Sequence, residues 1–105
     1  MRRIFTGILT FSMLLTGCVN SSVESISRLE LIKRRGSLIC GVSGKIPGFS
    51  FLDSNGTYQG LDVDICKAFA AAFLGSSDKV QFRPLTAPER FTAIRTGEID
   101  LLSRK

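Results

Sequence analysis

Hydrophobic and polar positions in residues 26–103 follow a pattern that predicts three helices and three strands in alternation. Ile26, Leu29 and Ile32 recur at helical spacing, and Gly36 is a typical helix stop. The sequence SLICGV that follows is a short apolar run with β-branched residues, as expected of a buried strand. The first predicted unit is therefore a helix followed by a strand.

A second helix is predicted over residues 62–75. Ile65, Phe69 and Phe73 recur every four residues there, with Cys66 and Ala70 beside them, so one helix face is apolar. Residues 43–60, which precede this helix, are rich in glycine and contain the sequence DSNG, a strong turn signal. We expect this stretch to form a loop or a small hairpin.

The rest of the pattern predicts a further strand, helix and strand. Residues 79–85 alternate apolar and polar side chains, which is typical of a half-buried strand. Residues 86–97 predict a helix that begins with a capping box formed by Thr86 and Glu89. Residues 98–103 are predicted to form a final apolar strand.

The order helix, strand, helix, strand, helix, strand predicts an α/β fold with a parallel sheet covered by helices. Sheets of this kind bind ligands beyond the carboxyl ends of their strands. The last of these ends coincides with the end of the 105-residue chain. We therefore expect the chain to be part of a longer fold, either a truncated gene product or a fragment.

Composition fits one small globular domain, with 44% hydrophobic and 22% charged residues. The formal net charge of +5 falls to +3 (12 basic minus 9 acidic residues) once Arg2 and Arg3 near the N-terminus are set aside. The remaining basic residues are scattered apart from Lys33, Arg34 and Arg35, which fit the solvated end of a helix. This distribution argues against nucleic acid as a partner, and the absence of histidine removes the commonest general base and zinc ligand.

The N-terminus has the layout of a secretory signal peptide over residues 1–17, with a basic start and an apolar run. The sequence LTGC that ends at Cys18 resembles the lipobox of bacterial lipoproteins. This resemblance implies cleavage before Cys18, acylation of its sulfur, and a polar tether over residues 18–25 that holds the domain at the membrane. The predicted location is the periplasm or cell envelope, and the alternative is an uncleaved anchor.

Export affects the interpretation of Cys40 and Cys66. Outside the cytoplasm, paired thiols tend to form disulfides, and Cys18 is already assigned to lipid. A disulfide between Cys40 and Cys66 is therefore predicted. The alternative is a pair of buried reduced thiols that act as small apolar side chains.

The sequence GLDVDIC places Asp62, Asp64 and Cys66 close together, which raises the possibilities of a metal site, a catalytic pair or a helix start. Positions i and i+2 of a helix point to roughly opposite sides, so the two carboxylates do not meet. We therefore expect Asp62 to be the N-cap residue and Asp64 to interact with the positive end of the helix dipole. Cys66 has no histidine partner, and the sequence indicates no catalytic site, metal or cofactor.

Two arginines are candidates for contact with a ligand. Arg90 falls near the start of a predicted helix, where a cation opposes the helix dipole, so an anion in a cleft is one possible partner. The alternative for Arg90 is pairing with Glu89 or a surface position. Arg104 follows the last strand, where α/β sheets collect ligand-binding residues, and its alternative is a disordered terminal residue.

Two long segments of the chain resemble a known family. The sequences GFSFLDSNGTYQGLDVDIC and RFTAIRTGEIDLLSR are similar to those of periplasmic amino-acid-binding proteins of ABC importers, solute-binding protein family 3. The similarity is greatest to the subgroup that takes a broad range of L-amino acids. It implies two α/β lobes that close on the ligand, of which residues 26–105 supply the incomplete first lobe.

The resemblance also implies a set of ligand-binding positions. The turn from Ser43 to Phe49 corresponds to one cleft wall, and Ile46 stands where many relatives have an aromatic residue over the ligand. Arg90 matches an arginine that contacts the side chain of acidic ligands in some relatives. Ser103 and Arg104 match the entry to the segment that grips the amino and carboxylate groups.

The function implied is an extracytoplasmic, monomeric substrate-binding component that hands an L-amino acid to an ABC permease. The family's main carboxylate-binding arginine lies beyond this sequence, so we expect the chain alone to bind poorly or not at all. Two alternatives remain open, an exported dehydratase-type enzyme on the same scaffold and the sensory domain of a signalling receptor.

Overall fold

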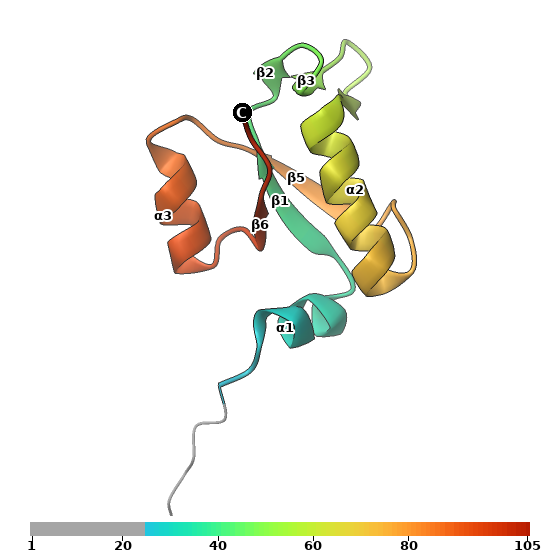
Figure 1. The fold of residues 1–105 in the computed structure, drawn as a ribbon, viewed down its shortest axis with the longest axis vertical. Helices are drawn as coiled ribbons and strands as arrows, with labels where there is room; N and C mark the ends of the chain where they lie inside the picture. The colour runs from blue at the N-terminus through green and yellow to red at the C-terminus, as the bar shows by residue number, and fades with distance from the viewer. Residues whose placement is uncertain (1–24) are drawn as a thin grey trace, which may run out of the picture.

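A computed structural model describes residues 25–105 and centres on a parallel three-stranded sheet (Figure 1). Strand β1 (Leu38–Val42) lies in the middle, with β5 (Val80–Pro84) on one side and β6 (Leu101–Leu102) on the other. Both outer strands run parallel to β1. The predicted α/β fold with a parallel sheet is confirmed. The predicted signal peptide, Cys18 and nearly all of the tether lie outside the described residues.

Helices cover both faces of this sheet (Figure 1). After α1 (Arg28–Arg35), helix α2 (Leu61–Leu74) packs on β1 and β5, and α3 (Glu89–Thr96) packs beside β6. The chain moves from β1 to β5 in one direction and then passes back over β1 to reach β6. Because parallel crossovers are right-handed, these opposite movements place α2 and α3 on opposite faces.

The side chains of β1 alternate between the two faces. Those of Leu38, Cys40 and Val42 are buried in the core beneath α2. Gly41 faces α3, where a Cβ atom would lie 2.6 Å from the Cδ1 atom of Ile99. A side chain at this position would therefore require the side chains of Ile99 and Leu85 to move.

Residues 45–59 form a second, antiparallel sheet above the carboxyl ends of the parallel strands. Its strands are β2 (Lys45–Ile46), β3 (Ser50–Leu52) and β4 (Tyr58–Gln59). The sequence predicted a loop or a small hairpin in this region, and the structure adds a third strand. The DSNG turn forms as expected, because the Asp53 carboxylate accepts hydrogen bonds from the backbone amides of Asn55 and Thr57.

The start of α2 differs from the prediction. The N-cap residue is Gly60, not Asp62, and no side chain caps the helix. Instead, the carbonyl oxygens of Gly48 and Phe49 accept the amide hydrogens of Leu61 and Asp62, at 3.0 and 2.8 Å. The preceding loop therefore supplies the acceptors that an N-cap side chain would provide.

The buried face of α2 is shifted within the predicted one. Ile65 and Phe69 were expected to point inward, yet their exposed fractions are 39% and 40%. Cys66 and Ala70, predicted on the same apolar face, are fully buried, together with Val63. The smaller side chains fit because α2 lies close to β1, to which Cys66 is bonded.

The predicted capping box at the start of α3 is half formed. The Glu89 carboxylate accepts a hydrogen bond from the backbone amide of Thr86 at 2.8 Å, as a capping box requires. The Thr86 hydroxyl does not accept a hydrogen bond from the Glu89 amide but donates to the same carboxylate at 2.6 Å. Pro88, predicted in the first turn, is the N-cap residue.

The structure contains the predicted disulfide. Cys40 in β1 is bonded to Cys66 in α2, and both side chains are fully buried. This covalent link ties the central strand to the helix that covers it.

A buried carboxylate that the sequence did not reveal joins α1 to the sheet. The side chain of Asp100 is inaccessible to solvent and accepts a hydrogen bond from the Ile39 amide at 2.8 Å. Arg35 forms an ion pair with the same carboxylate, and the Nη1 atom of Arg28 lies 3.4 Å from its other oxygen. Each acceptor atom of Asp100 is therefore engaged.

Replacing Asp100 with asparagine is expected to lower the free energy of unfolding by about 2 kcal/mol, because charge-assisted hydrogen bonds are lost in a buried setting. Urea denaturation followed by circular dichroism measures this change. The control is Glu30→Gln, which removes an exposed i,i+4 pair with Arg34 and should change stability by less than about 0.5 kcal/mol. Equal effects of the two substitutions would contradict the role assigned to Asp100.

Candidate functional site

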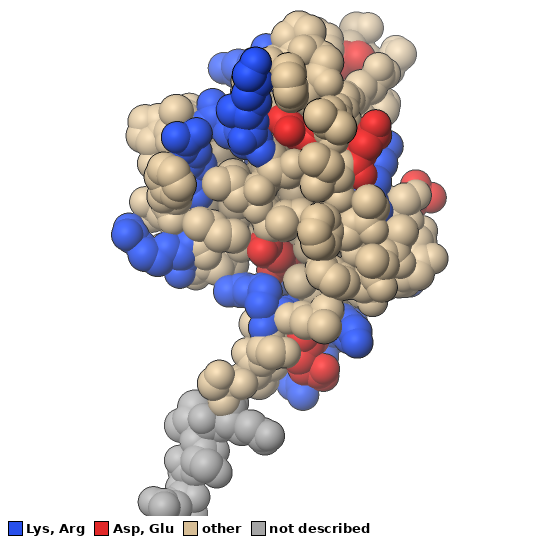
Figure 2. Space-filling model, in the orientation of Figure 1, with Lys and Arg blue, Asp and Glu red and all other residues tan. Residues whose placement is uncertain are grey.

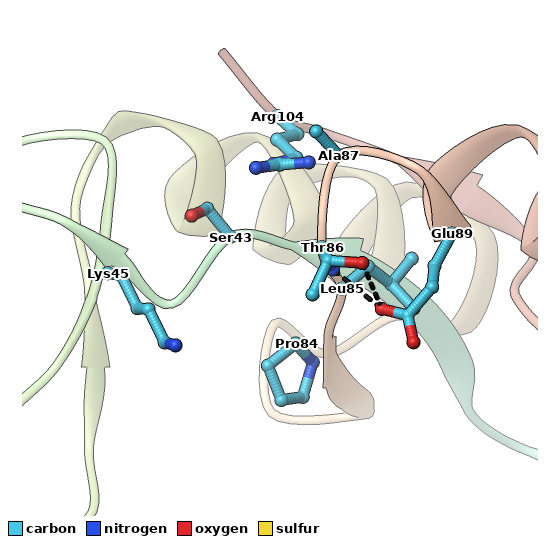
Figure 3. A pocket seen from close by; sticks show the side chains of 8 residues that line it. All are labelled: Ser43, Lys45, Pro84, Leu85, Thr86, Ala87, Glu89 and Arg104. Atoms are coloured by element: carbon cyan, nitrogen blue, oxygen red, sulfur yellow. Dashed lines mark hydrogen bonds between the residues drawn. The ribbon is translucent and has the colours of Figure 1, made fainter.

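A hollow of about 440 Å³ opens at the carboxyl edge of the parallel sheet (Figure 3). Its wall combines the last residue of β5 with residues that follow β1, β5 and β6 in the chain. The lining residues are Ser43, Lys45, Pro84, Leu85, Thr86, Ala87, Glu89 and Arg104.

The parallel ladder brings these residues together. Beyond the strands, the Leu85 amide donates to the carbonyl of Val42 at 2.8 Å, and the Ser103 amide donates to the carbonyl of Gly41 at 3.0 Å. The connections that leave β1 and β5 then run to opposite faces of the sheet, which leaves a crevice between them. The pocket occupies this crevice.

A buried hydroxyl holds the turn that forms one wall. The Oγ atom of Ser50 accepts hydrogen bonds from the amides of Ser43 and Gly44, each at 3.1 Å. Gly44 has a φ of 75°, a backbone conformation that favours glycine. The turn that presents Ser43 and Lys45 to the pocket is therefore fixed by β3, although the sequence analysis did not single out Ser50.

The guanidinium group of Arg104 has hydrogen-bond donors for which the described residues provide no acceptor. Its Nε and Nη1 atoms are shielded from solvent and have no hydrogen-bond acceptor among residues 25–105. Burial of charged donors without acceptors is unfavourable, so such a group at a pocket wall is suited to an anionic ligand. In Figure 3 its guanidinium extends toward Ser43, across the top of the hollow.

The segment that carries Arg104 is tied to the start of α2. The backbone amide of Lys105 donates to the Asp62 carboxylate at 3.3 Å, and the Lys105 ammonium lies 4.7 Å from the ring centre of Phe49. Asp62 is buried. Its side chain therefore holds the residue next to Arg104, which differs from the helix-capping role predicted for it.

Glu89 is the acidic residue of the pocket wall, and it stays ionised. The hydroxyl and then the amide of Thr86, both hydrogen-bonded to its carboxylate, lower the pKa of Glu89. Because the folded-state pKa is lowered, the stabilisation is present above the ordinary pKa of glutamate and is lost as pH falls through the lowered value.

Ser43 and Arg104 are the two predicted binding residues that the structure brings together in this pocket. Ile46 is half-buried in β2, and Ser103 is buried in the ladder next to β1. Phe49 uses its carbonyl to cap α2. These three residues do not line the hollow.

Arg90 also lies outside the pocket wall. Its Nε atom is shielded from solvent without a hydrogen-bond acceptor, and its guanidinium carbon lies 4.7 Å from the ring centre of Phe91.

Lys45 lies in the turn predicted to form one cleft wall but was not singled out, and the pocket role of Thr86 and Glu89 was not predicted. All three residues come shortly after the end of a predicted strand, and this position could have marked them as candidates for ligand contact. Their distance from one another could not be inferred, since it depends on the register of β1 with β5.

Residues 25–105 contain no cluster of three histidine, cysteine, aspartate or glutamate side chains that could hold a metal ion. Within the same range, no helix combines the length and apolar character needed to cross a membrane.

The family model of bacterial extracellular solute-binding proteins, family 3, matches residues 38–105. The chain therefore belongs to this family. The resemblance inferred from the sequence is confirmed.

Individual relatives support the same family assignment. The glutamate/glutamine/aspartate/asparagine-binding protein BztA of Rhodobacter capsulatus is 45% identical over 100 residues, covering 95% of this chain and 28% of BztA. An ABC transporter periplasmic binding protein from Brucella ovis, solved with glutathione bound, has a TM-score of 0.73 at 44% identity, covering 75% of this chain and 25% of that chain. The chain thus spans less than a third of either protein.

Two other solved structures bear on the function. The arginine-bound form of domain 1 from TmArgBP has a TM-score of 0.65 at 32% identity, covering 72% of this chain and 57% of that chain. An ancestral cyclohexadienyl dehydratase has a TM-score of 0.67 at 34% identity, covering 76% of this chain and 32% of that chain. The scaffold therefore occurs in a ligand-bound single domain and in an enzyme.

Proposed function

We propose that the chain is part of the substrate-binding component of an ABC importer for L-amino acids. The observation that carries this proposal is the unsatisfied guanidinium of Arg104 at the wall of the carboxyl-edge pocket. A ligand carboxylate supplies the acceptors that Arg104 lacks, through charge-assisted hydrogen bonds. The hydroxyl of Ser43 and the carboxylate of Glu89 provide further polar contacts for an amino acid in the same hollow.

The proposal includes a cellular setting, supported by the sequence and the family. The signal peptide over residues 1–17 and acylation of Cys18 place the protein on the periplasmic side of a membrane, where it delivers its ligand to a permease as a monomer. Labelling with a palmitate analogue tests the anchor. Label is expected in the full chain and not in a Cys18→Ser variant, and equal labelling would contradict lipidation at Cys18.

We infer that the protein is not an enzyme. The chain has no histidine. Among the described residues, Glu89 is the one acidic residue that lines the pocket, so the wall offers no pair of carboxylates. The Glu89 carboxylate is also engaged by two hydrogen bonds from Thr86. Incubation of the purified protein with prephenate or arogenate distinguishes a binding protein from a dehydratase-type enzyme. Turnover of either compound by the purified protein would favour the enzyme.

Binding to the chain alone is expected to be weak. The chain spans 28% of the length of BztA, so contacts made by the rest of such a protein are outside this sequence. We expect dissociation constants in the millimolar range, about −4 kcal/mol, rather than the micromolar range. The single domain of TmArgBP with arginine bound supports the use of one domain for this measurement.

NMR titration of the full ¹⁵N-labelled chain with a panel of L-amino acids tests the proposed function. Amide shifts are expected at Ser43, Thr86 and Arg104, with fast exchange. The amide of Lys79, at the opposite end of β5, serves as the control and should not shift. Absence of shifts with every amino acid at concentrations well above the millimolar range would contradict amino-acid binding by this chain, and micromolar affinity would contradict the expected weakness.

A further inference from the structure

The residues that line the pocket carry more positive than negative charge. Among its lining residues Lys45 and Arg104 are cationic, and Glu89 alone is anionic. The three charges sum to +1 (two positive minus one negative). Figure 3 shows Lys45 and Glu89 on opposite sides of the hollow and Arg104 above them, so the three groups surround the space that a ligand would occupy.

Neither cation is neutralised by the described part of the protein. The ion pairs within residues 25–105 involve Arg28, Arg34, Arg35 and Arg83, and none includes Lys45 or Arg104. Two donor atoms of Arg104 are buried without an acceptor, whereas the ammonium of Lys45 belongs to an exposed residue at the rim. The pocket thus has a deeper cation and an outer cation.

Glu89 does not cancel these charges. Its carboxylate accepts two hydrogen bonds from Thr86, which hold it at its own side of the pocket. These contacts favour its ionised form, so it remains available to a ligand ammonium while it leaves Arg104 and Lys45 without a counter-charge.

We propose that the pocket selects L-amino acids that carry a second carboxylate in the side chain, and that Lys45 determines this selection. An acidic amino acid has two carboxylates and one ammonium, which match Arg104, Lys45 and Glu89 one to one. A neutral amino acid leaves one pocket cation without a counter-charge. This inference rests on the proposed amino-acid-binding function and specifies its ligand class.

The surface around the site supports an anionic ligand. Figure 2 shows lysine and arginine side chains gathered around the C-terminal end of the chain, which lies at the same edge of the sheet. The Lys105 ammonium lies 4.7 Å from the ring centre of Phe49 and takes part in none of the ion pairs within residues 25–105. A positive field at the mouth of a cleft raises the local concentration of anionic ligands.

The test compares ligands that differ in charge but hardly in shape. The full chain is titrated with L-glutamate and L-glutamine, and with L-aspartate and L-asparagine, by NMR in the same buffer. We expect the acidic member of each pair to bind about tenfold more tightly, as expected for a gained charge-assisted hydrogen bond. The difference should shrink as salt is raised, because partly exposed charges are screened.

Three single variants test which residue causes the preference for acidic amino acids. Lys45→Gln is expected to reduce the glutamate preference to near unity, chiefly by weakening glutamate binding. Arg104→Gln is expected to weaken both ligands. Lys79→Gln, a substitution of an exposed lysine outside the pocket, is the matched control and should keep the preference.

Each result has a defined consequence. Equal or tighter binding of the neutral ligands overturns this inference and leaves the amino-acid function standing. A preference that survives Lys45→Gln overturns the role of Lys45. Failure of every amino acid to bind overturns both the inference and the proposed function.

Discussion

Replacing Gly60 with alanine is expected to lower the free energy of unfolding by more than about 3 kcal/mol. A Cβ atom on Gly60 would lie 2.3 Å from the carbonyl oxygen of Phe49, which is backbone and cannot rotate away. The residue also has a φ of 125°, a conformation that side chains rarely adopt. Relief of the clash would move the carbonyl that caps α2 through the Asp62 amide.

Gly75→Ala is the matched control for this prediction. Gly75 ends the same helix with a φ of 77°, but a Cβ there would meet no atom within 4 Å. Its substitution therefore introduces only the left-handed backbone penalty, about 1 kcal/mol. Thermal and urea unfolding, followed by circular dichroism, compare the two variants. Equal destabilisation would show that close contact with Phe49 is unimportant.

Removing the disulfide with the double substitution Cys40→Ala and Cys66→Ala is expected to lower the free energy of unfolding by about 3.5 kcal/mol. The bond joins residues separated by 26 positions, so it restricts a loop of that size in the unfolded chain. Because it also fastens β1 to α2, its loss should loosen the helix whose first turn contains Asp62, the residue that holds the segment next to Arg104.

Reduction provides the control for the disulfide. A reducing agent should lower the urea midpoint of the unaltered protein and leave that of the double variant unchanged. Cys18→Ser should retain the full sensitivity to the reducing agent. If the unaltered protein has the same midpoint with and without reductant, Cys40 and Cys66 are not bonded in solution.

Local sequence signals were sufficient for most of the parallel sheet. The apolar run in residues 37–42 and the alternation in residues 79–85 correspond to β1 and β5, because such patterns reflect which faces of a strand are buried. Gly36, Gly75 and Gly97 end their helices as expected, each with a positive φ. These features depend on neighbours in the chain and need no knowledge of distant segments.

The start of α2 could not be predicted in this way. Asp62 is a good N-cap residue by type, and local rules favoured it. The structure instead satisfies the first amides of the helix with carbonyls of Gly48 and Phe49, so Asp62 is free to accept the Lys105 amide. A partner 43 positions away in the chain determines its role, and no local pattern shows such a partner.

The sequence by itself determined the fold class, the family resemblance, the cysteine pair and two of the pocket residues, Ser43 and Arg104. These follow from hydrophobic period, residue type and motif. Tertiary structure alone decided that the Lys45 side chain and Glu89 line the same pocket, and that Asp100 binds α1 to the sheet. The physical reason is that charges interact through space, and strand register rather than spacing in the chain sets which of them meet.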